Sequence, residues 1–121
     1  MSKFKTFLNK KLKNKKISQN KFARMIDVTP TYVNKMIKGM SGPPDRELQI
    51  KIANSLEIEG EERNKFFNNL AKEKNDIPSD IYNEIFNNKN SWNRIREILK
   101  KEKIIKWKIK LMYCGMIIQL M

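Results

Sequence analysis

Apolar residues recur at intervals of three and four over most of the chain, the spacing of helices that each bury one face. In the first segment Phe4, Phe7, Leu8 and Leu12 fall on one face, and lysines occupy much of the other. Four more segments repeat the pattern, with Phe22, Ala23 and Ile26; Val33, Met36 and Ile37; Leu48, Ile52, Ala53 and Leu56; and Phe66, Phe67, Leu70 and Ala71. The pattern predicts an all-α fold with a five-helix domain over residues 1–75.

Capping residues set the limits of the second and third helices. Ser18 is a suitable N-cap for the second, because a serine hydroxyl can accept a bond from an unpaired first-turn N–H. Thr29 can cap the third, and Pro30 suits its first position, where no backbone donor is needed. Gly39, two residues after Ile37, can end the third helix, because glycine readily takes the left-handed conformation found at helix C-termini.

A helical extension over residues 76–121 follows the five-helix domain. NDIPSD begins a sixth helix, which carries Ile81, Ile85 and Phe86, and a seventh carries Trp92, Ile95, Ile98 and Leu99. We expect Trp92 to be buried in a core.

The last stretch, residues 104–121, permits two interpretations. Its first apolar residues alternate with lysines, as in a strand. Ile98, Ile105 and Met112 are seven apart, which would instead continue the seventh helix as a coiled-coil seam. Either form leaves apolar surface uncovered, which favours self-association. The alternative is a frayed, disordered tail that packs loosely on its own domain.

Charge is distributed unevenly along this chain of net charge +13. Residues 1–40 carry eleven Lys and Arg against one acid, a net of +10, whereas residues 41–90 carry seven against ten, a net of −3. Residues 91–121 carry eight against two, a net of +6. Such asymmetry indicates a face that meets a polyanion.

The composition argues against an enzyme, a cofactor and a metal site. The chain has no histidine, and its lone Cys114 cannot form an intrachain disulfide or a zinc cluster. No glycine-rich phosphate loop is present, so we expect no catalytic residues. A spanning helix needs about 18 consecutive apolar residues, and the chain has no such run. With no secretory signal at the basic N-terminus, we expect a cytoplasmic protein.

In residues 19–38, small and apolar residues have the spacing expected of two short helices that are joined by a turn and pack against each other. Ala23 is a small residue where a second helix could cross closely, and Asp27 occupies the turn. Val28, Val33 and Met36 then supply buried positions. This arrangement would let the second helix lie in a DNA major groove.

The stretch ISQNKFARMIDVTPTYVNKMIKG resembles the helix-turn-helix of phage-repressor-type (Xre family) regulators. The resemblance extends over about residues 3–72 and implies a five-helix DNA-binding domain. The turn position is usually Gly in that family and is Asp27 here. Asp adopts the left-handed region more readily than most residues, so we expect the turn to be kept at modest strain.

The resemblance also implies roles for side chains on double-stranded DNA. Gln19 would bond a phosphate, and the start of the third helix would face the groove. Asn34 could pair with adenine, and Lys35 could reach guanine. Lys21, Lys38 and the lysines of the first helix would contact phosphates. The predicted DNA-binding residues are Gln19, Lys21, Thr29, Pro30, Thr31, Tyr32, Asn34, Lys35 and Lys38.

Three functions remain open on the sequence. The first is a transcriptional regulator, most simply a repressor, that binds an inverted repeat as a homodimer. The second is a phage or mobile-element protein whose C-terminal region binds and blocks a defence nuclease or toxin, with Trp92 and Trp107 as candidate anchors. In that case the helix-turn-helix would serve autoregulation. The third is a coat that binds nucleic acid without sequence preference.

Overall fold

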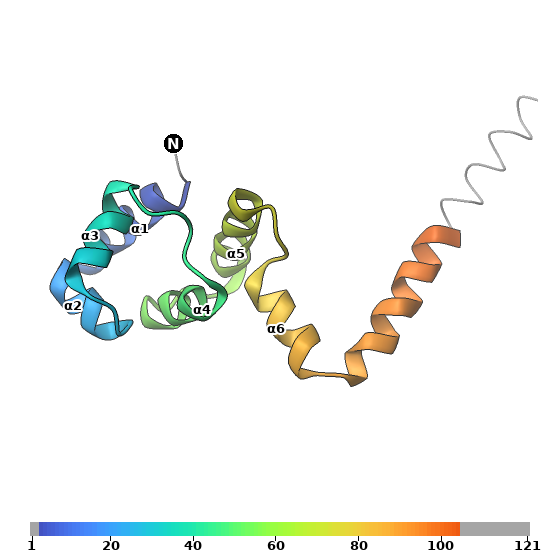
Figure 1. The fold of residues 1–121 in the computed structure, drawn as a ribbon. Helices are drawn as coiled ribbons and strands as arrows, with labels where there is room; N and C mark the ends of the chain where they lie inside the picture. Colours follow the sequence, from blue (N-terminus) through green and yellow to red (C-terminus); the bar gives the residue numbers. More distant parts are fainter. Residues whose placement is uncertain (1–2, 105–121) are drawn as a thin grey trace, which may run out of the picture. The chain divides into compact units, whose positions relative to one another are not determined.

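A computed structural model describes residues 3–104, and every regular element in that range is an α-helix (Figure 1). The helices are α1 (Lys3–Lys15), α2 (Gln19–Met25), α3 (Pro30–Lys38), α4 (Arg46–Ser55), α5 (Gly60–Lys74) and α6 (Ser79–Asn87). Residues 90–104 are also helical. The predicted all-α fold is confirmed. By contacts the chain divides into two units, Met1–Asn83 and Glu84–Met121.

The predicted caps on α2 and α3 are present. The Ser18 hydroxyl accepts a hydrogen bond from the Lys21 N–H at 3.1 Å, and the Thr29 hydroxyl accepts one from the Tyr32 N–H at 3.2 Å. Gly39 ends α3 with a φ of 72°, in the left-handed region that glycine adopts without penalty. The start of the third helix is therefore fixed by the residues that the sequence indicates.

Five helices of the first unit end in the same way. A left-handed residue follows the helix, and the N–H of the next residue bonds to the carbonyl five positions back, which is the Schellman motif. The bonds run from Ile17 to Leu12, Val28 to Ala23, Met40 to Lys35, Ile58 to Ala53 and Asp76 to Ala71, all at 2.9–3.0 Å. The left-handed residues are Lys16, Asp27, Gly39, Glu57 and Asn75. Only one of them is a glycine, so the sequence signals four of these ends poorly.

One hydrophobic core holds α1 to α5 together. α2 packs on α3, α1 on both α3 and α5, and α4 on α5 (Figure 1). The fully buried residues include Leu8, Phe22, Ile52 and Phe67, as the apolar spacing predicts. Ile58, from the acidic segment before α5, joins them, and the pattern did not indicate it.

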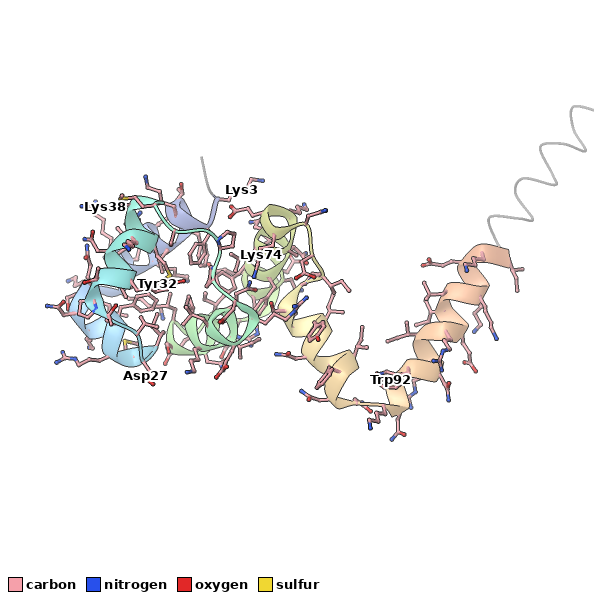
Figure 2. The ribbon with its side chains drawn as sticks, viewed as in Figure 1. Lys3, Asp27, Tyr32, Lys38, Lys74 and Trp92 are labelled. Atoms are coloured by element: carbon pink, nitrogen blue, oxygen red, sulfur yellow. The ribbon has the colours of Figure 1, made fainter. Side chains whose placement is uncertain are left out.

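The second unit is described up to residue 104, and there the expectation for Trp92 is wrong. Its side chain, labelled in Figure 2, is 38% exposed, and its indole N–H donates to the carbonyl of Ile85. It links the two sides of the corner between α6 and the next helix and does not enter a core.

Some of the sequence predictions fall on residues outside the described range. These are the roles of Trp107 and Cys114 and the choice between helix and strand for the tail. Within residues 3–104, no helix is both long and apolar enough to cross a membrane.

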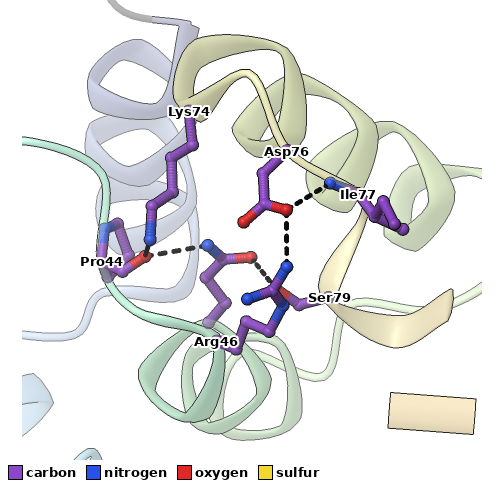
Figure 3. Close-up of polar contacts among 7 residues, drawn as sticks. Pro44, Arg46, Lys74, Asp76, Ile77 and Ser79 are labelled. Carbon is purple, nitrogen blue, oxygen red and sulfur yellow. Dashed lines mark hydrogen bonds and ion pairs between the residues drawn. The ribbon is translucent and has the colours of Figure 1, made fainter. Parts of the chain in front are cut away.

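A cluster of polar contacts joins α4 to the segment that leads into α6 (Figure 3). Gln49 is buried, donates to the Pro44 carbonyl at 2.8 Å and accepts from the buried Ser79 hydroxyl at 2.7 Å. Beside it, Arg46 bonds to the Asp76 carboxylate at 2.6 Å. The predicted domain boundary, after residue 75, falls within this cluster, and the first unit continues to Asn83.

Candidate nucleic-acid interface

The outward face of α3 consists of polar side chains at helical spacing. We refer to Thr31, Asn34, Lys35 and Lys38 as the α3 polar stripe; Asn34 is half-buried and the others are exposed. At about 100° per residue, the middle of this stripe lies about 180° from the midpoint of Val33 and Met36. Both of those residues are buried in the core. Burial of one side of α3 therefore presents the polar side outward.

The turn between α2 and α3 sets the position of this face. Asp27 has a φ of 56°, which confirms that an Asp takes the left-handed turn position. The Val28 N–H reaches back to the Ala23 carbonyl at 3.0 Å, and the Val28 side chain is partly buried against the core. Ala23 is almost wholly buried, and α2, the helix that contains it, packs against α3. The turn therefore holds the two helices in one arrangement.

A direct hydrogen bond links two of the predicted DNA-binding residues, one on α2 and one on α3. The Asn34 side-chain amide donates to the Gln19 side-chain oxygen at 3.1 Å. An amide nitrogen carries two hydrogens, so this bond leaves Asn34 one donor and its oxygen for another partner. The sequence suggested a role for each residue, but it did not indicate that they touch. The bond restricts the Asn34 rotamer before any ligand arrives.

α1 supports the other end of α3 through Asn9, which sequence reasoning did not select. The Asn9 amide donates to the carbonyls of Lys5 and Ile37, both at 3.0 Å. The Lys5 side chain also lies against Gly39, where a Cβ would be 2.9 Å from the Lys5 Cδ. Asn9 lies on a helix rich in lysine and asparagine, so no local signal distinguishes it.

The predicted site residues divide into two groups. Gln19, Lys21, Thr29, Pro30, Thr31, Lys35 and Lys38 are all exposed. Tyr32 and Asn34 are half-buried, and Tyr32, labelled in Figure 2, packs against the core. The Thr29 hydroxyl already accepts the capping bond, which leaves its hydrogen to donate.

The charge of this surface is positive. α3 contains Lys35 and Lys38 and no acid, and Lys21 is exposed on α2. On α1, by contrast, some lysines are paired: Lys11 bonds to Glu62 at 2.6 Å, and Lys15 lies 3.7 Å from Glu57. α2 and α3 thus contain four basic residues, Lys21, Arg24, Lys35 and Lys38, and no acid. Among residues 3–104, no three potential metal-ligating side chains gather in one place.

Comparison with known proteins supports this geometry. Residues 8–62 match a family model described as Helix-turn-helix, and the match spans α2, α3 and all of α4. No curated protein and no solved structure matches the chain.

Proposed function

Residues 8–62 belong to the helix-turn-helix family of the phage-repressor (Xre) type, and on that premise we propose that the protein is a sequence-specific repressor acting as a homodimer. The family supports DNA binding and a role in regulating transcription. Occupation of promoter DNA would then block transcription directly. No catalytic step is required.

The α3 polar stripe is the observation that carries this proposal. Its side chains match the groups on base edges in the major groove. Asn34 offers a donor and an acceptor to adenine, and Lys35 offers donors to guanine O6 and N7. Thr31 has both a hydroxyl and a methyl group, so it can meet a base edge or a thymine methyl.

Other residues would set position and affinity without reading sequence. Gln19 and Lys21 lie in the first turn of α2, where they can bond to phosphates beside the groove. Lys38 and the first lysines of α1 would add phosphate contacts. In a homodimer, two copies of α3 would enter successive major grooves about 34 Å apart, so the operator would be an inverted repeat.

Selection of binding sites from random duplexes tests this function. We expect the full chain to enrich one inverted-repeat sequence whose half-sites lie one helical turn apart, in the presence of excess competitor DNA. Enrichment of no sequence, with equal affinity for all duplexes, would contradict specific recognition and favour a nonspecific coat.

Exposed apolar side chains favour a second candidate function. Ile98 and Leu99 are at least half exposed on the helix of residues 90–104, as expected for a surface that binds protein. The chain could use this helix to inhibit a protein partner and use α3 to regulate its own promoter. In that case Asn34→Ala would weaken promoter binding by ~1–3 kcal/mol and leave inhibition of the partner unchanged. If Asn34→Ala alone removes all biological effect, regulation is the main function.

A further inference from the structure

Two neighbouring helices expose large apolar side chains. On α6, Ile81 is 47% and Phe86 is 64% exposed, and on the helix of residues 90–104, Ile98 is 56% and Leu99 is 50% exposed. Single exposed apolar residues are common, but a succession of them along two helices marks an interaction surface.

The two helices carry opposite charge. α6 has Asp80 and Glu84 and no basic residue, a net of −2. Residues 90–104 have five basic residues (Arg94, Arg96, Lys100, Lys101 and Lys103) and two acids (Glu97 and Glu102), a net of +3. Each helix would therefore repel a copy of itself and attract the other.

Charged residues also border the apolar ones on each helix. At about 100° per residue, Glu84 lies about 60° from Ile81 around α6. On the helix of residues 90–104, Arg96 and Lys103 lie about 40–60° from Leu99 by the same measure. We call the exposed apolar residues of each helix its seam: Ile81 and Phe86 on α6, with Glu84 beside Ile81, and Ile98 and Leu99 on residues 90–104, with Arg96 and Lys103 beside Leu99.

Hydrogen bonds fix the corner that joins these helices. The Asn88 N–H bonds to the Glu84 carbonyl at 3.1 Å and the Ser91 N–H to the Asn88 carbonyl at 3.0 Å. The Trp92 indole closes the corner on the Ile85 carbonyl. With the corner bonded in this way, Phe86 before it and Leu99 after it both remain at least half exposed.

We propose that a second copy of this chain covers both seams. α6 of one copy packs against residues 90–104 of the other, and the same contact is repeated in the opposite sense. The inference rests on the homodimer of the proposed function and assigns its interface. Each copy contributes one acidic and one basic helix, so the pairing is complementary in both halves.

Sedimentation of the full chain at rising concentration gives the first test. We expect a reversible dimer. A chain that stays monomeric up to its solubility limit would overturn the proposal, and so would a dimer that persists unchanged when the charge of either helix is reversed.

Paired charge reversals then identify the interface. Asp80→Lys with Glu84→Lys changes α6 from −2 to +2, and Arg96→Glu with Lys103→Glu changes residues 90–104 from +3 to −1. Each variant alone should self-associate ~10-fold or more weakly, because like charges oppose each other across the interface. Mixed together, the two variants should form heterodimers, because both contacts then join opposite charges.

A matched control separates this interface from general attraction between oppositely altered chains. Glu59→Lys with Glu61→Lys and Lys10→Glu with Lys13→Glu make the same changes in net charge at exposed sites elsewhere. We expect each control variant to dimerise as the parent does, without preference for the mixture. Equal heterodimer preference in both mixtures would overturn the proposal.

Two further measurements report the folding of each variant and its selection of DNA sequence. Circular dichroism shows whether each variant folds, and if replacement of Asp80 unfolds the chain, Glu84→Lys alone takes its place. Site selection from random duplexes is scored separately. A monomer that still selects one sequence would refute the interface and leave specific DNA reading intact. A dimer that selects no sequence would contradict specific DNA reading and leave the proposed interface intact.

Discussion

At the scale of the residue, Asp27 determines how α3 is presented. Its φ of 56° is a conformation that costs a non-glycine residue roughly 1 kcal/mol. We expect Asp27→Gly to raise the free energy of unfolding by roughly 0.5–1 kcal/mol in urea titrations, because glycine adopts the positive φ without strain. The greater conformational entropy of glycine in the unfolded chain offsets part of this gain. Asp27→Ala is the matched control, because it removes the carboxylate and keeps the Cβ. A destabilised glycine variant would show that the carboxylate itself holds the turn.

Asp76 supplies a pH-dependent contribution to stability. The Ile77 N–H, which bonds to its carboxylate at 2.7 Å, and then the neighbouring Arg46 lower the pKa of Asp76 below its ordinary 3.8. A lowered folded-state pKa means that the stabilisation is fully present above pH 3.8 and is lost as pH falls below it. We expect Asp76→Asn to be less stable than the parent at pH 7, with the gap narrowing as the pH falls below 3.8. Denaturant titrations at several pH values would measure it, and a gap independent of pH would contradict this account.

At the scale of the element, the buried pair Gln49 and Ser79 secures the segment before α6 to α4. We expect Ser79→Ala to lower the free energy of unfolding by ~1–3 kcal/mol, because it leaves the Gln49 oxygen buried without its donor. Ser41→Ala is the control, since the Ser41 hydroxyl is buried without a hydrogen-bond partner in the described structure and its loss should cost nothing. Equal effects of the two substitutions in urea titrations would refute the role of the pair.

The elements differ in how far the sequence predicts them. Helix starts at Ser18 and Thr29 were predictable, because each cap bonds to a residue only three positions away. The burial of Gln49 was not predictable, since its hydrogen-bond partner Ser79 lies 30 positions further along the chain. The link between Gln19 and Asn34 joins residues 15 apart and needs the turn to be folded first. The candidate site residues could therefore be selected one by one from the sequence, whereas the contacts between them could not be predicted.

At the scale of the whole molecule, the net charge of +13 makes DNA affinity depend on salt. Removing one lysine that binds a phosphate should reduce the slope of log K against log salt by about 0.9. We expect Lys21→Ala to weaken binding to all sequences equally and to reduce the slope by that amount. Lys74→Ala is a comparison, because Lys74 bonds to the Pro44 carbonyl away from the stripe. A change in base preference on Lys21→Ala would show that Lys21 reads sequence.

The central claim is that the α3 polar stripe reads base sequence, and Asn34→Ala tests it most directly. Affinities of the parent and the variant are measured for the selected operator and for every single-base change in one half-site. We predict that the variant loses ~1–3 kcal/mol of discrimination at one adenine position and keeps its preferences elsewhere. If Asn34→Ala retains the full base preference of the parent at every position, the stripe does not read base sequence through Asn34.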